Sequence, residues 1–179
     1  MRFTGGKAGS QRILTGETEN VKPTLAKIRE AVFNTLFSLD KTGVFGDLYS
    51  GSGMMAFEAA SRGFEKVVAF EIHPKSAAII RENAKRTGLN VDVFTGDVLR
   101  LLRKITEKFD VVYIDPPYYG GLYEKTLETL LSCGVCNKGA IVALERPTDV
   151  EVDISGFSGT EPVKTKVYGK KAVDYLRIL

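Results

Sequence analysis

From residue 44 onward, short runs of apolar residues alternate with stretches in which apolar residues recur at helical spacing. Continuous apolar runs of this length predict buried strands, and the stretches between them predict amphipathic helices. Strands are expected at 44–49, 67–71, 91–95, 109–114 and 140–144, and helices at 54–62, 74–88, 98–105 and 122–131. This alternation is typical of a parallel sheet that is covered by helices on both faces.

Three further segments flank this pattern. Residues 2–14 predict a short hairpin around several glycines. Thr24 is a good N-cap for a helix whose apolar residues lie close to helical spacing. Residues 162–167 and 172–178 predict an antiparallel pair of strands around Gly169.

Together these elements predict one α/β domain with a Rossmann-like, doubly wound sheet that is mostly parallel and carries a C-terminal antiparallel hairpin. The domain is expected over 23–179, after a hairpin appendage and linker over 1–22. The chain has 44% hydrophobic and 26% charged residues, the balance of a globular protein. No apolar run approaches the ~20 residues of a membrane span, and residues 1–6 lack the apolar region of a signal peptide. A cytoplasmic protein without a membrane partner is therefore expected.

The net charge of +3 permits nucleic-acid binding without requiring it. The distribution of the charge is more informative about a binding partner, because basic residues are concentrated in the first and last stretches of the chain. These residues are Arg2, Lys7, Arg12, Lys22, Lys27, Arg29, Lys164, Lys166, Lys170, Lys171 and Arg177. Together the two ends favour a polyanionic partner.

The two cysteines, Cys133 and Cys136, form a C-x-x-C pair. A structural zinc site needs four ligands, and the single histidine, His73, lies in a different predicted element. A thioredoxin-type pair opens a helix, whereas this pair follows a helix and precedes a strand. We therefore expect incidental thiols in a reducing compartment, with no metal or redox role.

The first predicted strand ends in a glycine turn, Asp47-Leu48-Tyr49-Ser50-Gly51-Ser52-Gly53. In a doubly wound sheet, ligands bind outside the carboxyl ends of the strands. Glycines there let the backbone approach a ligand, and the N–H groups of the following helix can contact a polar or anionic group. A dinucleotide motif needs a third glycine where Ala56 stands, and no P-loop sequence occurs.

Carboxylates follow three successive predicted strands. Asp47 precedes the glycines, where it suits a cationic amino-acid group better than a phosphate. Glu71 is placed to accept hydrogen bonds from two ribose hydroxyls, and Asp97 could meet an adenine amino group. Together, the carboxylates at these three strand ends predict a binding site for an adenosyl ligand that carries a positively charged amino acid.

The fourth predicted strand ends in Asp115-Pro116-Pro117-Tyr118. Two prolines alone indicate a stiff turn, but they do not explain the acid and the aromatic ring on either side. A nucleobase amine is a poor nucleophile because its lone pair is delocalised into the ring. The Asp115 carboxylate and the Pro116 carbonyl can accept hydrogen bonds from both N–H groups of the amine and direct its lone pair at a donor methyl. Tyr118 can stack on the base. The tetrapeptide therefore predicts methylation of an amine.

Both motifs resemble motifs I and IV of class I amino-methyltransferases, and the whole chain is similar to the RsmD family of bacterial 16S ribosomal RNA (guanine-N2)-methyltransferases. The resemblance rests on the glycine-rich N-terminal hairpin, Lys22-Pro23-Thr24 with Arg29-Glu30, the two motifs and the C-terminal strand pair. It implies that S-adenosylmethionine is the cofactor. It also implies that the target is the exocyclic N2 of a guanine in the helix 31 loop, within the 30S subunit or its assembly intermediate.

The resemblance further implies roles for individual residues. S-adenosylmethionine would be held by Asp47, Tyr49, Ser50, Gly51, Gly53, Glu71, Ile72, Asp97 and Val98. The amine would be oriented by Asp115, Pro116, Pro117 and Tyr118, and the RNA would contact Lys7, Arg12, Lys22, Thr24 and Arg29. The family usually has an aromatic residue and Arg-Gly-Arg around the hairpin loop, where this chain reads Lys7-Ala8-Gly9-Ser10-Gln11-Arg12 and carries less positive charge.

Three other interpretations remain open at this point. A DNA adenine-N6 methyltransferase shares the D-P-P-Y motif, but usually has a recognition insertion for which this chain has no room. A nicotinamide-dependent dehydrogenase conflicts with the missing third glycine, and a non-catalytic RNA-binding module would not need the acidic strand ends. The acceptors of the tetrapeptide suit adenine N6, cytosine N4 and guanine N2 alike. Nothing in the predicted site needs a second subunit, so a monomer is expected.

Overall fold

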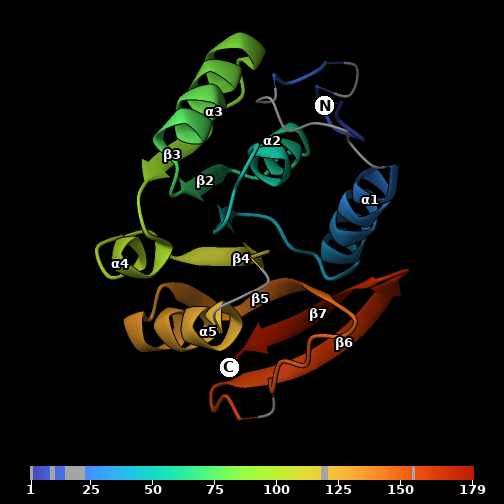
Figure 1. Ribbon diagram of the computed structural model, residues 1–179, viewed down its shortest axis with the longest axis vertical. Helices are drawn as coiled ribbons and strands as arrows, with labels where there is room; N and C mark the ends of the chain where they lie inside the picture. The colour runs from blue at the N-terminus through green and yellow to red at the C-terminus, as the bar shows by residue number, and fades with distance from the viewer. Residues whose placement is uncertain (1, 9–10, 15–22, 118–120, 155) are drawn as a thin grey trace.

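The computed structural model describes residues 2–8, 11–14, 23–117, 121–154 and 156–179. Within these ranges, helices pack against both faces of one seven-stranded sheet (Figure 1). The helices are α1 (Pro23–Ser38), α2 (Met54–Ser61), α3 (Pro74–Thr87), α4 (Val98–Leu102) and α5 (Leu122–Cys133). The strands are β1 (Val44–Asp47), β2 (Lys66–Glu71), β3 (Asp92–Thr95), β4 (Phe109–Ile114), β5 (Cys136–Pro147), β6 (Thr160–Tyr168) and β7 (Lys171–Ile178).

The order of strands across the sheet is β3-β2-β1-β4-β5-β7-β6. The strands from β3 to β5 in this order are parallel, whereas β7 is antiparallel to both β5 and β6. The chain winds outward from β1 to β3 and then returns to β4 on the other side of β1, so the strand order reverses between β1 and β4. The predicted doubly wound sheet with a C-terminal antiparallel hairpin is confirmed.

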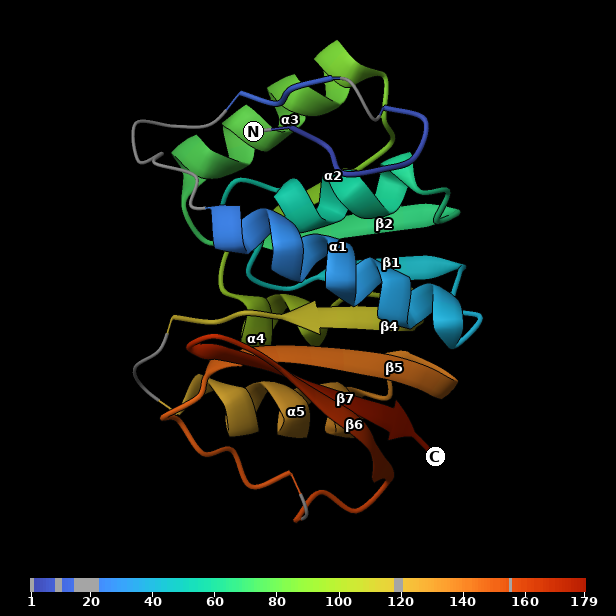
Figure 2. The same ribbon diagram turned by 90° about the vertical axis from the view of Figure 1, so that its right-hand side faces the viewer.

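Alternate side chains of the central strands enter two separate cores. In β4, Val111 and Tyr113 pack in the core that includes residues of α1, α2 and α3, whereas Val112 and Ile114 pack in the core that includes residues of α4 and α5. Figure 2 shows α1 in front of the sheet and α4 behind β4. Because both faces are covered, the central strands carry apolar side chains on both faces, which explains the continuous runs in the sequence.

Some element boundaries differ from the predicted ones. β5 extends beyond the expected 140–144 at both ends, because β4 pairs with Cys136 and β7 pairs with Pro147. Pairing with β4 and β7 therefore keeps the polar ends of β5 in the strand, whereas the apolar pattern of the sequence predicts only its centre. α4 ends at Leu102 rather than 105, where Arg103 caps it. In the part of the chain that the structure describes, no helix is long and apolar enough to cross a membrane.

Among residues 2–8 and 11–14, an isolated antiparallel bridge between Arg2 and Arg12 stands in place of the two strands of the predicted hairpin. Apolar side chains of this N-terminal segment are buried in the same core as α1 and α2: Phe3, Ala8 and Ile13. Gly6 has a positive φ of 76°, and a Cβ atom there would lie 2.0 Å from the carbonyl oxygen of Ser61. Glycine therefore lets this loop approach the end of α2 closely.

Candidate active site between two adjoining cavities

Two adjoining cavities open at the carboxyl edge of the sheet, where β1 and β4 are neighbours. The first cavity, of about 410 Å³, is lined by Leu48, Tyr49, Gly51, Phe70, Glu71, Ile72, His73, Gly96, Asp97, Val98, Leu99, Asp115, Pro116, Pro117 and Leu122. The second cavity, of about 220 Å³, is lined by Arg29, Asp47, Tyr49, Ser50, Gly51, Ser52, Met54, Met55, Tyr113, Asp115 and Glu145. Tyr49, Gly51 and Asp115 line both cavities and so form the boundary between them.

The glycine turn between β1 and α2 depends on left-handed backbone conformations. Gly51 has a φ of 51° and Gly53 a φ of 77°, which L side chains rarely adopt. The turn is tied to β1 by the Ser50 hydroxyl, which donates a 2.8 Å hydrogen bond to the Asp47 carbonyl. The N-terminus of α2 follows directly at Met54.

Asp47 ends β1 and is 1% exposed, at the wall of the second cavity. Its Oδ2 atom accepts a 3.1 Å hydrogen bond from the backbone N–H of Ala56 in α2. Burial raises the pKa of Asp47 to about 7, although the hydrogen bond from Ala56 opposes this shift. A cationic group bound in the second cavity would favour the ionised form and form an ion pair with it.

Glu71 ends β2 beside the first cavity and is 6% exposed. One oxygen accepts a 2.8 Å hydrogen bond from the N–H of Gly51, and the other accepts one of 2.7 Å from the N–H of His73. Each carboxylate oxygen has two lone pairs, so both retain the capacity to accept from a ligand. Asp97 caps α4 by accepting a 2.9 Å hydrogen bond from the N–H of Arg100, and also lines this cavity.

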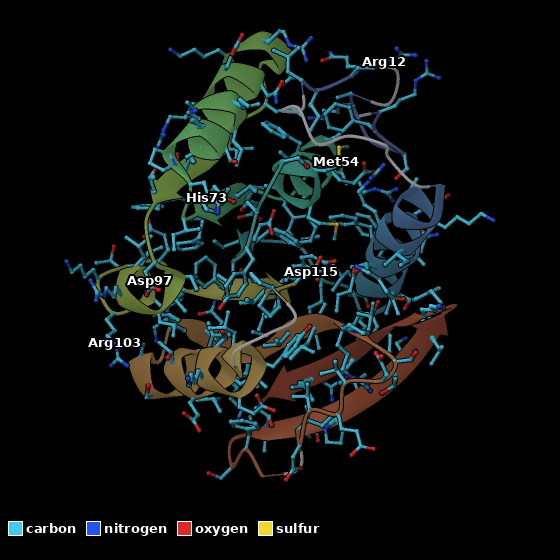
Figure 3. All side chains as sticks on the ribbon, viewed as in Figure 1. Arg12, Met54, His73, Asp97, Arg103 and Asp115 are labelled. Carbon is cyan, nitrogen blue, oxygen red and sulfur yellow. The ribbon has the colours of Figure 1, made fainter. Side chains whose placement is uncertain are left out.

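The apolar part of the first cavity includes an aliphatic side chain that the protein leaves largely uncovered. Ile72 is 57% exposed, while Val98 is buried at the start of α4. Figure 3 labels His73, Asp97 and Asp115, which line the cavity from the ends of three different strands. An exposed isoleucine among carboxylates suits a ligand that has a flat apolar face and polar edges.

Asp115, Pro116 and Pro117 follow β4 and line the first cavity, while Tyr118 lies outside the described residues. The side chain of Asp115 is 33% exposed. Burial and the nearby Glu145 raise the pKa of Asp115 to about 7, and Lys171 opposes this shift. At the boundary between the two cavities, Asp115 is therefore the carboxyl group that titrates near neutral pH.

Three charged or polar groups around Asp115 were not predicted to form part of the site. Tyr113 on β4 and Lys171 on β7 both donate hydrogen bonds to Glu145, which is 3% exposed on β5. The Nζ atom of Lys171 lies 3.9 Å from Oδ2 of Asp115. Burial and the adjacent Glu145 raise the pKa of Tyr113 well above its usual value, so the hydroxyl stays protonated and donates. Glu145 ends a predicted strand, a signal that could have identified it.

The expected RNA-contacting residues occupy different environments. Arg29 lines the second cavity but is 4% exposed, and its Nε atom pairs with Glu58 at 3.2 Å. Lys7 and Arg12 are exposed, and Figure 3 shows Arg12 well away from Asp115. Lys22 and the side chain of Thr24 lie outside the described residues.

The remaining expected cofactor-binding residues surround the two cavities. Tyr49 donates to or accepts from Thr126 of α5 at 2.6 Å, which anchors its ring at the boundary. Gly53 precedes α2 and lines neither cavity, so its contribution is the turn itself.

Cys133 and Cys136 are free thiols, and burial raises the pKa of Cys136 to about 12. The described residues include no group of three or more His, Cys, Asp or Glu that could hold a metal ion.

Comparison with known proteins gives one family. The model of a family described as "Conserved hypothetical protein 95" matches residues 1–177. "Ribosomal RNA small subunit methyltransferase D" of Buchnera aphidicola is 30% identical over 143 residues, which are 79% of this chain and 75% of that protein.

Two solved structures superpose on nearly the full length of this chain. A hypothetical protein from Thermus thermophilus superposes with a TM-score of 0.81 at 26% identity, over 99% of both chains. A putative methyltransferase from Escherichia coli has a TM-score of 0.83 at 22% identity, over 99% of this chain and 97% of that one, which supports the fold alone. The chain belongs to the RsmD family of methyltransferases, the family that this model describes.

Proposed function

We propose that this protein transfers a methyl group from S-adenosylmethionine to the exocyclic N2 of a guanine in 16S rRNA, in the helix 31 loop of the 30S subunit or its assembly intermediate. The observation that carries the proposal is the position of Asp115. It follows β4, lines both cavities, and lies across the switch point from the glycine turn of β1. A cofactor that extends through the two adjoining cavities therefore passes the carboxylate that would hold the amine.

The residues of the first cavity fit an adenosyl group. Its volume of about 410 Å³ suits a small-molecule ligand. Glu71 and Asp97 offer acceptors for hydroxyl and amino donors, and the exposed Ile72 offers an apolar surface for a ring. Asp47 in the adjoining cavity offers a carboxylate for the ammonium group of the methionine part. When bound, the cofactor would supply the methyl group of its sulfonium and leave as a neutral thioether, and the methylated amine would release one proton to water.

The protein's own contribution is to hold the amine in the reactive orientation. The Asp115 carboxylate and the Pro116 carbonyl accept hydrogen bonds from the two N–H groups of the amine. The nitrogen lone pair therefore points out of the base plane toward the methyl group. Pro116 and Pro117 have no N–H to compete for these acceptors, and their fixed φ keeps the acceptors in place. Close approach and alignment then provide most of the acceleration.

The identity of the base and of the RNA rests on the family. The tetrapeptide accepts any of three exocyclic amines, and the guanine in the small-subunit rRNA is proposed from the resemblance and the printed name of the relatives. The exposed Lys7 and Arg12 would contribute phosphate contacts. The site is built within one chain, so we propose that a monomer acts in the cytoplasm, where ribosomal subunits are assembled.

The test is methyl transfer from labelled S-adenosylmethionine to 30S particles from a strain that lacks the modification, with the nucleoside identified by mass spectrometry. N2-methylguanosine formed by the wild type and not by Asp115→Ala is the expected result. N6-methyladenine in duplex DNA, with no label in rRNA, would replace this proposal by a DNA methyltransferase. Binding of NADH but not of S-adenosylmethionine would support a dehydrogenase instead. Cofactor binding without transfer to any nucleic acid would support a non-catalytic RNA-binding module.

A further inference from the structure

The C-terminal hairpin brings a cation to the site because its second strand is antiparallel. A parallel strand delivers its last residues to the carboxyl edge of the sheet, whereas an antiparallel strand delivers its first. Lys171 is the first residue of β7 and pairs with Pro147 at the end of β5. Figure 2 shows the turn between β6 and β7 on the side of the sheet toward which β4 points.

Lys171 is fixed between two carboxylates. Its Nζ atom donates a hydrogen bond to Oε1 of Glu145 and lies 3.9 Å from Oδ2 of Asp115. Glu145 is itself held, because the Tyr113 hydroxyl donates to its other oxygen. The ammonium group therefore has a defined place beside Asp115, although the lysine side chain is long and flexible.

We propose that Lys171 is a positioning residue that keeps Asp115 ionised, so that Asp115 accepts an N–H of the target amine rather than donating a proton toward its lone pair. The methylation chemistry in this statement rests on the proposed function. The electrostatic part concerns only residues of this chain. It is therefore testable without an RNA substrate.

The charges around Asp115 explain why a cation is needed. Asp47 from β1, Glu71 from β2, Asp97 at the start of α4 and Glu145 from β5 are acidic groups that line the same cavities, and His73 after β2 also lines the first. Tyr113 from β4 donates to Glu145 and therefore adds no positive charge. Arg29 from α1 is a cation at the second cavity, but its guanidinium is bonded to the buried Glu58. Among the described residues, Lys171 is thus the cation whose ion pairs are with Asp115 and Glu145.

The protonation state of Asp115 decides what it offers to an amine. An ionised carboxylate has only acceptors, whereas a protonated one also carries an O–H donor. Such a donor would compete for the nitrogen lone pair that attacks the methyl group. Burial and Glu145 raise the pKa of Asp115 to about 7 and Lys171 opposes them, so loss of Lys171 raises it further. At neutral pH, Asp115 would then be largely protonated in a variant that lacks the Lys171 charge.

The test compares Lys171→Met, which keeps the aliphatic stem, with Lys171→Arg, which keeps the charge. Lys170→Met is the matched control, because Lys170 is the exposed neighbour in the same turn. The Asp115 carboxyl carbon is followed by carbon-13 NMR as a function of pH, with its signal identified by its loss in Asp115→Asn. The pH profile of kcat/KM on 30S particles and the affinity for S-adenosylhomocysteine are measured on the same proteins.

In Lys171→Met, we expect the NMR titration of Asp115 and the acidic limb of kcat/KM to move to higher pH by about one pH unit, the effect of removing an opposite charge at this distance. Activity should recover at high pH, Lys171→Arg should restore most of the profile, and Lys170→Met should leave the Asp115 titration and the pH of the acidic limb unchanged. An unchanged Asp115 titration, or a loss of kcat/KM that is the same at every pH, would overturn the inference. A displaced titration in a protein that methylates no nucleic acid would instead support the electrostatic role of Lys171 and contradict the proposed function.

Discussion

The carboxylate of Glu71, at the end of β2, accepts a 2.8 Å hydrogen bond from the backbone N–H of Gly51, in the turn that follows β1. Its other oxygen accepts from the N–H of His73 at 2.7 Å. One side chain thus holds the glycine turn and the start of α3 in place before any ligand arrives. The first cavity is preorganised by the residue that is also expected to bind the ligand.

Replacement of Glu71 by glutamine should therefore weaken cofactor binding. The amide keeps one acceptor, but its NH₂ group faces a backbone N–H and cannot bond to it. We expect a loss of about 1–3 kcal/mol in the affinity for S-adenosylhomocysteine, measured by calorimetry. Glu65→Gln changes the same charge at an exposed position of the chain and should bind normally. Equal affinities in Glu71→Gln and the control would exclude Glu71 from the cofactor site.

Substitution of Asp115 should separate binding from chemistry. Asp115→Ala is expected to abolish turnover, since the amine loses its charged acceptor, while the dissociation constant for S-adenosylhomocysteine changes little. The control is Asp149→Asn, which removes one negative charge at an exposed site and should remain active. A parallel loss of cofactor binding and turnover in Asp115→Ala would indicate that this residue holds the loop rather than the substrate.

The buried Asp47 should make stability depend on pH when no cofactor is bound. Its pKa of about 7 in the folded protein, raised by burial, lies above the ordinary value of 3.8, so the folded state binds the proton more tightly. Stability from this group is therefore present below about pH 4 and is lost as pH rises to about 7.

Asp47→Asn removes this titration, while the other ionisable groups stay the same. Between about pH 5 and about pH 8, the variant should gain roughly 2–3 kcal/mol of unfolding free energy relative to the wild type, measured in urea. A difference that does not vary with pH would show that Asp47 is ionised throughout.

Arg29 should contribute to stability in addition to any contact with substrate. It is buried beside Glu58, which is 0% exposed, so Arg29→Met leaves a carboxylate with a weakened set of partners. We expect a loss of about 1–3 kcal/mol in unfolding free energy, because Glu58 keeps its ion pair with Arg62. Lys27→Met, on an exposed position of the same helix, should stay within about 0.5 kcal/mol of the wild type. If both variants unfold like the wild type, the ion pair does not stabilise the fold.

The exposed basic residues of the N-terminal segment should act on RNA through their charge. Lys7→Glu and Arg12→Glu are expected to weaken binding to 30S particles and to lower the slope of affinity against salt by about 1 each. Lys138→Glu reverses an exposed charge near the start of β5, at the edge of the sheet opposite the site, and is the control. Equal slopes for all three variants and the wild type would mean that the N-terminal segment makes no phosphate contacts.

The sequence predicted those parts of the site that depend on local order along the chain. Asp47, Glu71, Asp97 and Asp115 all follow strands that their apolar runs identify, and parallel topology brings such ends to one edge. The doubly wound sheet was predicted from the same alternation, and the C-terminal hairpin from two strand-like stretches around Gly169. These features need only the alternation of elements, which a single sequence carries.

The parts that could not be predicted depend on packing between distant segments. Lys171 stands in a turn of basic residues, and nothing in that pattern distinguishes it from the exposed Lys170. Its partnership with Glu145 requires the register between β5 and β7. The RNA contact of Arg29 was expected from the family resemblance, and its buried ion pair with Glu58 in another helix had no signal in the sequence. Long-range partners of charged side chains leave no periodic signal.

The antiparallel course of β7 also separates the parts of the site in the order of synthesis. A growing chain completes β1 to β4, and with them the walls of the first cavity, before Lys171 has been translated. Domains generally fold as units. The cofactor side of the site and the charge balance at Asp115 are therefore expected to form together, only after the hairpin has been synthesised.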